Sequence, residues 1–164
     1  MTEIKPLIQR GEPDCSLLSC LNAVRFNTPD IGKNIDQNTA DKLMPLYTRN
    51  SVLEGVKFLR EQWYDLKYLP VSYSGAKNLM KRGRAIICRR KYNKNWFYDV
   101  KDDWEANGTA PIDIDVKRSW HFFVLKQEWE KYRAWDSNAP FTYLVDLEHY
   151  HREGVIGDTF YQVK

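Results

Sequence analysis

The first half of the chain repeats its hydrophobic positions at the spacing of helices. Two stretches show the pattern most clearly, residues 15–26 and residues 52–63. The first begins beside Cys15, and the second follows a capping box that starts at Ser51, so we expect an amphipathic helix at each. Shorter helices are expected over residues 39–47 and 74–80.

The second half changes to short apolar runs of the kind that form strands. Residues 120–125 and 132–135 are separated by a short polar turn, which predicts a hairpin within an antiparallel meander. Further strands are expected at residues 66–73, 85–88 and 158–163, and a long insertion at 91–118. Helices followed by a sheet predict an α+β fold, in which a helix residue can meet sheet residues across a cleft.

Length and composition fit a single folded domain over residues 1–164. The chain is 43% hydrophobic and 29% charged, and a domain of this size buries about 70% of its unfolded surface. No run of 18 apolar residues occurs and the N-terminus lacks a signal-peptide pattern, so we expect no membrane span and a cytoplasmic location.

Charge gives little support for nucleic-acid binding. The net charge is +3, well below the concentrated charge of a dedicated nucleic-acid binder. A basic stretch with interleaved aromatic rings spans residues 81–98, but acidic residues follow at once and cancel much of its field. We therefore interpret this stretch as a solvated strand edge that leads into the insertion, and we do not expect a nucleic-acid partner.

Cys15 is the candidate nucleophile. It falls at the start of a predicted helix, where the unpaired N–H groups carry a partial positive charge that favours the thiolate. Asp14 opposes this effect unless its carboxylate turns toward the same N–H groups. The odd number of cysteines argues against a disulfide framework. Cys20 and Cys88 are expected to be small buried residues.

A thiol nucleophile needs a base, a group that orients the base, and donors for the oxyanion. His121 opens the first strand of the predicted hairpin, and Asp136 ends the second. The start of one hairpin strand lies beside the end of the next, so the two side chains should meet at one edge. Asp136 would then orient His121, with Asn138 as a rival for that role. Gln9 would donate its side-chain amide to the oxyanion, together with the backbone N–H of Cys15.

These residues resemble a known family. Segments 9–24, 120–125 and 134–140 are similar to papain-like cysteine peptidases, most closely the bacteriocin-processing (C39-like) group, in which a Gln precedes an Asp-Cys pair and a His opens an apolar strand. The resemblance implies a papain-like fold with the nucleophile helix packed on a C-terminal antiparallel sheet. It also implies a cofactor-independent thiol protease that cleaves peptide or protein substrates, commonly after small residues such as a double glycine, with Gln9, Cys15, His121 and Asp136 in the roles given above.

Two departures from the family pattern keep alternatives open. Ser16 stands where the family usually has glycine, and Ser137 stands where it usually has proline. A catalytically degenerate papain-like module that binds or inhibits a partner is one alternative, and a transglutaminase-like acyltransferase with the same Cys/His/Asp set is another. His149 and His151, together with Asp146 and Glu148, show an alternate spacing that could suggest a metal site on a strand, but a fourth convergent ligand is lacking elsewhere, so no metal is expected.

Overall fold

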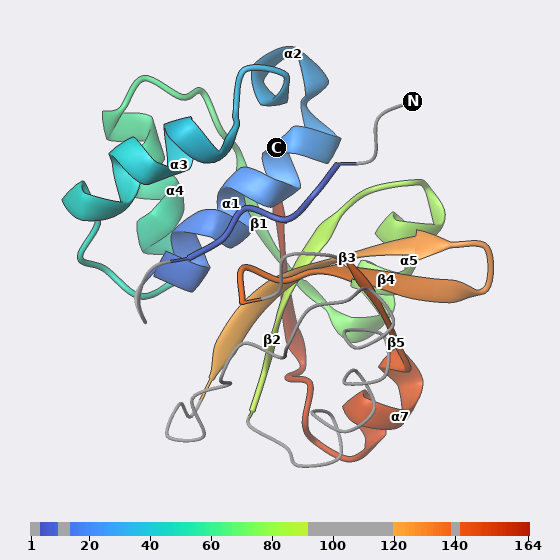
Figure 1. Ribbon diagram of the computed structural model, residues 1–164. Helices are drawn as coiled ribbons and strands as arrows, with labels where there is room; N and C mark the ends of the chain where they lie inside the picture. Colours follow the sequence, from blue (N-terminus) through green and yellow to red (C-terminus); the bar gives the residue numbers. More distant parts are fainter. Residues whose placement is uncertain (1–3, 10–13, 92–119, 139–141) are drawn as a thin grey trace, which may run out of the picture.

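The computed structural model describes residues 4–9, 14–91, 120–138 and 142–164. In chain order its elements are α1 Asp14–Asn27, α2 Pro29–Gly32, α3 Gln37–Leu43, the 3₁₀ helix η1 Met44–Leu46, α4 Val52–Glu61, β1 Tyr68–Ser72, α5 Tyr73–Lys81, β2 Ile86–Arg90, β3 His121–Glu128, β4 Lys131–Trp135, β5 Tyr143–Val145, α7 Leu147–Arg152 and β6 Thr159–Val163. The strands form one antiparallel sheet in the order β1-β6-β2-β3-β4-β5 (Figure 1). The predicted α+β class is confirmed.

Side-chain caps fix where the helices begin. Ser51 accepts a hydrogen bond from the backbone N–H of Glu54 at 3.1 Å, as the capping box predicts for α4. For α5 the cap is Ser72 and not Ser74, because the hydroxyl of Ser72 accepts from the N–H of Gly75 at 3.2 Å. Helix α5 therefore begins directly after β1, since the last strand residue already has the extended backbone that an N-cap needs.

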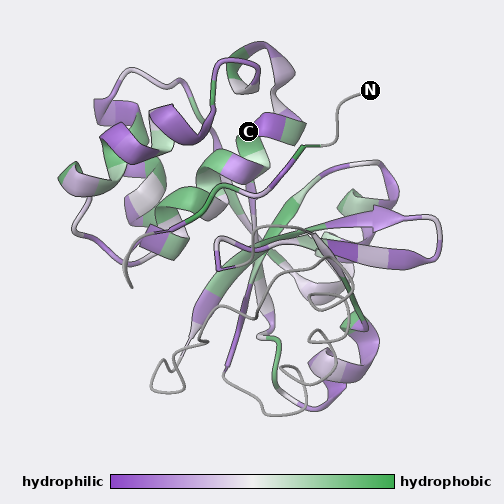
Figure 2. Ribbon diagram, viewed as in Figure 1, coloured by the Kyte–Doolittle hydropathy of each residue, from purple (hydrophilic) through white to green (hydrophobic). Residues whose placement is uncertain are grey.

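Each face of the sheet carries its own hydrophobic layer. Alternate side chains of a strand point to opposite faces, so Phe122 and Val124 pack with the residues of α1, whereas Phe123 and Leu125 pack with those of α5 and α7. Helices α1 to α4 gather on one side in Figure 1, and α5 and α7 lie on the other. Figure 2 shows hydrophobic colour concentrated on α1 and the central strands, which places the main core between them.

The C-terminal strand β6 occupies a position that the sequence did not predict. It pairs along its whole length with β1 and also pairs with β2 through Tyr161 and Ile87. The predicted meander is present in β2, β3 and β4 and continues into β5. Strand β6 thus joins the first strand to that meander, and its order in the sheet depends on pairing between distant segments that no local pattern records.

Two short helices, α2 and α7, were also not predicted. The Thr28-Pro29 step ends α1, as expected, but Pro29 then opens α2, because proline is tolerated where the first helical N–H needs no partner. Gly32 closes this helix against α1, where a Cβ would lie 2.4 Å from the Cα of Arg25. The expected insertion at residues 91–118 falls outside the described residues, apart from Lys91.

Candidate active site

The hairpin of β3 and β4 brings His121 and Asp136 together. Val124 pairs with Trp135, so Asp136 follows β4 at the end where β3 begins. His121 Nε2 donates a hydrogen bond to Asp136 Oδ1 at 2.6 Å, because a carboxylate offers only acceptors. Both side chains are buried, with 3% and 1% exposure. The neighbourhood that the sequence predicted for this pair is present.

The distances favour Asp136 over Asn138 as the residue that orients the imidazole. The side-chain amide nitrogen of Asn138 lies 3.5 Å from Nε2 of His121, a nitrogen already committed to the shorter Asp136 bond. Asn138 contributes instead through its backbone, whose N–H donates to Asp136 Oδ1 at 2.9 Å. Asn138 therefore helps to hold the carboxylate that holds the ring.

Cys15 reaches the same place from the opposite part of the chain. It is the second residue of α1 and is 2% exposed. Burial lowers the pKa of the His121 imidazole and Asp136 raises it. The side chain of Cys15 also interacts with the ring and raises its pKa by a smaller amount. Within the described residues His121 Nδ1 has no hydrogen-bond partner, whereas Nε2 is bonded to Asp136. Nδ1 is the ring nitrogen left to exchange a proton with the thiol.

Asp136 lies in a strongly stabilising environment for its charge. Tyr143 donates a hydrogen bond to Oδ2 at 2.6 Å, and the guanidinium of Arg90 lies 3.7 Å from the same oxygen. Burial alone raises the pKa of Asp136, but His121, Arg90 and Tyr143 together outweigh it and hold the pKa well below its usual range. The carboxylate is therefore ionised at neutral pH.

His121 is held toward its protonated form. Burial lowers the pKa of the ring. The charge and hydrogen bond of Asp136, together with the Cys15 contact, raise it by more than burial lowers it, so the pKa of His121 lies above its ordinary value. The positive charge of Arg90 lowers the pKa of His121, because Arg90 pairs directly opposite His121 across β2 and β3. A neighbouring imidazolium favours the thiolate of a cysteine.

Cys20 and Cys88 have the structural role that the sequence predicted. Both are completely buried, and burial raises the pKa of each thiol. In addition, the thiol of Cys20 donates a weak hydrogen bond to the carbonyl of Val52 at 3.7 Å. Neither thiol is expected to react at neutral pH, which leaves Cys15 as the reactive candidate.

The structure places Gln9 beside the residue that follows Asp136. Its Oε1 accepts a hydrogen bond from the hydroxyl of Ser137 at 2.5 Å, and its backbone N–H donates to the Ser137 carbonyl at 2.9 Å. The segment 4–9, which precedes α1, is also attached at Ile4, whose carbonyl accepts a hydrogen bond from the indole N–H of Trp135 at 2.8 Å. Gln9 therefore joins the cluster through the 136–138 turn.

The sequence did not single out Arg90 or Tyr143. Arg90 was assigned to a solvated strand edge, and this is wrong, because its side chain is almost completely buried and its guanidinium lies 3.7 Å from the carboxylate of Asp136. A basic stretch gives no local sign that one of its members turns inward. Tyr143 comes from β5, the edge strand beyond β4, and its role depends on that pairing. A signal for either residue would need the sheet register.

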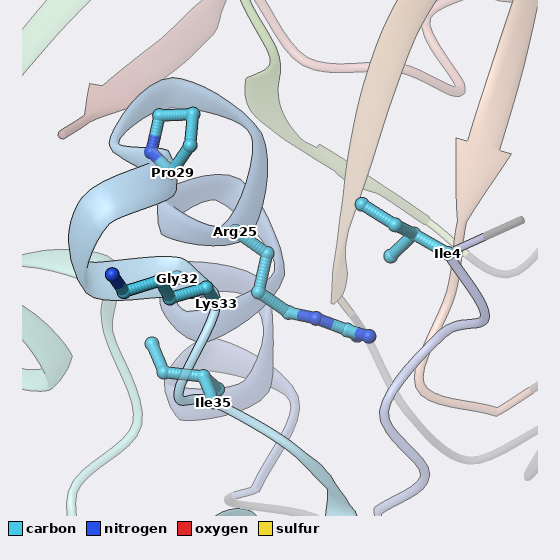
Figure 3. A pocket seen from close by; sticks show the side chains of 6 residues that line it. All are labelled: Ile4, Arg25, Pro29, Gly32, Lys33 and Ile35. Atoms are coloured by element: carbon cyan, nitrogen blue, oxygen red, sulfur yellow. The ribbon is translucent and has the colours of Figure 1, made fainter. Parts of the chain in front are cut away.

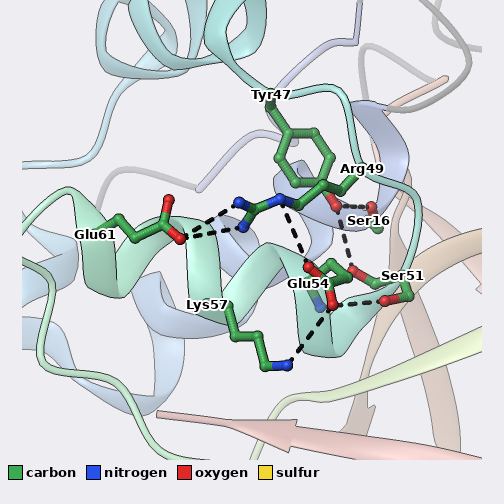
Figure 4. Close-up of polar contacts among 7 residues, drawn as sticks. All are labelled: Ser16, Tyr47, Arg49, Ser51, Glu54, Lys57 and Glu61. Atoms are coloured by element: carbon green, nitrogen blue, oxygen red, sulfur yellow. Dashed lines mark hydrogen bonds and ion pairs between the residues drawn. The ribbon is translucent and has the colours of Figure 1, made fainter.

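Ser16, next to Cys15 at the start of α1, forms a hydrogen bond with Tyr47. Its hydroxyl lies 2.6 Å from the hydroxyl of Tyr47, which in turn donates to the carbonyl of Ser51 at 3.2 Å (Figure 4). Burial is the main reason that the pKa of Tyr47 is raised to about 12. Ser16 therefore links α1 to the segment before α4.

A pocket of about 320 Å³ lies at the opposite end of α1 (Figure 3). Its lining residues are Ile4, Arg25, Pro29, Gly32, Lys33 and Ile35. Arg25 is ten residues after Cys15, roughly 15 Å along the helix at 1.5 Å per residue. The pocket is therefore separate from the candidate site.

The part of the chain that the structure describes has neither a cluster of metal-ligating side chains nor a helix that could span a membrane. Across residues 4–9, 14–91, 120–138 and 142–164, no three His, Cys, Asp or Glu side chains gather as a metal site would require. Within the same ranges, none of the helices combines the length and the apolar character needed to traverse a bilayer.

Comparison with protein-family models and with curated proteins finds no match to this chain. The geometry around Cys15, His121 and Asp136 therefore indicates what chemistry this chain can perform.

Proposed function

We propose that the protein is a cysteine hydrolase that cleaves peptide or isopeptide bonds through a thioester acyl-enzyme. One observation carries the proposal: a helix-start thiol, Cys15, contacts a buried imidazole that donates a 2.6 Å hydrogen bond to the ionised Asp136. A papain-like fold of the bacteriocin-processing type belongs to the same proposal. The packing of α1 on an antiparallel sheet supports it.

The proposed reaction assigns one role to each residue. The sulfur of Cys15 attacks the substrate carbonyl carbon, and its proton passes to Nδ1 of His121. The imidazolium then protonates the leaving amine as the C–N bond breaks, which leaves a thioester. Water, deprotonated by the same ring, hydrolyses the thioester and restores the thiol. Asp136 holds the ring throughout, and the Gln9 amide with the Cys15 N–H stabilises the oxyanion.

The contact of Ser16 supports an intact site over a degenerate one. The Ser16 hydroxyl is bonded to Tyr47, so the residue next to the thiol has a packing role of its own. Replacing Ser16 by alanine should lower stability by about 1 kcal/mol, the worth of a typical buried hydrogen bond, and leave Cys15 reactivity nearly unchanged. A large gain in reactivity would instead favour a site that Ser16 has impaired.

Alkylation across pH tests the reactive pair directly. We expect iodoacetamide to modify Cys15 at pH 6 faster than it modifies a free cysteine, as followed by intact mass and peptide mapping. Cys20 and Cys88 should stay unmodified in the folded protein, since burial raises the pKa of both. His121→Ala should remove the reactivity at pH 6, whereas His151→Ala, a matched change at a surface histidine, should retain it. A Cys15 that alkylates no faster than the free thiol contradicts the proposal.

Turnover identifies the reaction. Peptides with a double glycine are incubated with the protein, and their products are analysed by mass spectrometry. Cleavage should disappear in Cys15→Ala, and turnover that persists in this variant excludes the proposed nucleophile. Added methylamine separates the transglutaminase-like alternative from hydrolysis, because acyl transfer yields the methylamide and hydrolysis yields the carboxylic acid.

A further inference from the structure

We infer that Ser137 is a positioning residue that sets the side-chain amide of Gln9 for oxyanion stabilisation. This inference rests on the proposed function and deepens it. The hydroxyl of Ser137 donates its hydrogen bond to Gln9 and not to the thiol or the imidazole. Ser137 would therefore act on the reaction only through Gln9.

Two hydrogen bonds fix Gln9 to Ser137 across 128 positions of sequence. One joins the two backbones, from the Gln9 N–H to the Ser137 carbonyl at 2.9 Å. The other runs from the Ser137 hydroxyl to Gln9 Oε1 at 2.5 Å. A glutamine amide has one acceptor oxygen and two N–H donors. A hydroxyl that donates to the oxygen therefore selects the amide orientation and directs the N–H donors to the other side.

The position of Ser137 in the turn gives the contact its meaning. Asp136, one residue before, orients His121, and the turn is closed by the Asn138 N–H, which donates to Asp136 Oδ1 at 2.9 Å. One buried turn thus holds the orienting carboxylate through its first residue and the oxyanion donor through its second. Ser137 itself is 1% exposed, so its hydroxyl does not exchange freely with solvent partners.

Ser137→Ala removes the hydroxyl and leaves the backbone bond in place. Loss of a typical hydrogen bond corresponds to about three- to tenfold in rate, and removal of a whole oxyanion donor corresponds to about 10²–10³ in kcat. We therefore expect Ser137→Ala to lower kcat by about three- to tenfold with KM nearly unchanged. Ser137→Thr, which keeps a hydroxyl, should recover most of the loss.

A double-mutant cycle with Gln9→Ala tests the connection. Wild type, both single variants and the double variant are compared for kcat on a double-glycine peptide and for binding of a peptide aldehyde, whose thiol adduct carries an oxygen at the oxyanion position. If Ser137 acts through Gln9, Ser137→Ala weakens both in the wild-type background and changes neither in the Gln9→Ala background. Ser72→Ala, which removes the helix-capping hydroxyl of α5, controls for lost stability and should leave both readouts unchanged.

The outcomes separate this inference from the proposed function. Cys15-dependent turnover with equal effects of Ser137→Ala in both backgrounds overturns the inference alone, as does a Ser137→Ala effect confined to KM. A Ser137→Thr variant as impaired as the alanine variant also overturns it. Absence of Cys15-dependent turnover and of aldehyde adduct in the wild type overturns the proposed function, and the inference falls with it.

Discussion

Replacing Asp136 by asparagine should lower the pKa of His121 strongly. The substitution keeps the shape of the side chain but removes the negative charge 2.6 Å from Nε2. Two influences that lower the pKa of the ring then remain, its burial and the positive charge of Arg90 directly opposite. The contact with Cys15 is the only raising influence left among those that act on the ring in the described residues.

The size of the shift follows from the distance and the burial. An opposite charge within about 4–6 Å moves a pKa by about 1–3 units, and this pair is in direct contact with both partners buried. We expect a fall of about 2 units, which corresponds to about 2.7 kcal/mol at 1.36 kcal/mol per unit. The imidazolium would then lose its proton well below neutral pH, and rapid alkylation of Cys15 at pH 6 should be lost with it.

Titration by two-dimensional NMR measures this shift, because the chain has only 3 histidines to assign. In the wild type His121 should titrate above the ordinary histidine value, and in Asp136→Asn below it. Asp158→Asn is the matched control, since Asp158 bonds His151 at 2.8 Å on the surface, and it should leave the His121 titration in place. Equal His121 titration in wild type and Asp136→Asn would refute the reasoning, because the charge that we hold responsible would be absent.

Three further predictions concern stability. Tyr143→Phe removes a 2.6 Å hydrogen bond to a buried carboxylate and should cost about 1.5–3 kcal/mol in urea unfolding. Tyr132→Phe loses a 3.4 Å contact to the half-exposed carboxylate of Glu148 and should cost about 0.5 kcal/mol. Equal losses in the two variants would contradict this. Gly32→Ala should cost about 1–3 kcal/mol, because its Cβ meets backbone at Arg25; an unchanged melting temperature would show that the helices separate easily. The pKa of Asp136 is lowered in the folded state, so the stability that its charge contributes is present above about pH 4 and is lost as pH falls through the folded pKa. The free energy of unfolding should therefore fall less steeply with decreasing pH in Asp136→Asn than in the wild type. Parallel curves of stability against pH would exclude this contribution.

The parts of the fold that the sequence predicts are those encoded locally. The helix beside Cys15 and the helix capped by Ser51 follow from spacing and caps, and both are present. The β3–β4 hairpin follows from two apolar runs and a short turn, and it carries the predicted meeting of His121 with Asp136. A hairpin fixes its own register, so adjacency across it can be inferred without the rest of the sheet.

Long-range pairing sets the limit of the prediction. Arg90 is adjacent to His121 only because β2 pairs with β3 in one register across a segment of more than 28 residues. Tyr143 reaches Asp136 only because β5 adds to the edge of β4. The same holds for Ser137, whose side chain meets a glutamine from the other end of the chain. Each contact has a simple chemical reason, but its partner is selected by the topology.

The proposed mechanism requires the His121 ring both to take and to return a proton, and the charge of the buried Arg90 favours the release step. Asp136 alone would hold His121 as an imidazolium, and a base that never loses its proton cannot accept one from a thiol or a water molecule. Burial is the main influence that lowers the pKa of His121, and the charge of Arg90 adds to it while it also helps to keep Asp136 ionised. General acid–base catalysis works best when the pKa of the group lies near the working pH. Burial and the cation together therefore limit the influence of the carboxylate on the ring, and a buried arginine at this register position is compatible with the proposed role of His121 as acid and base.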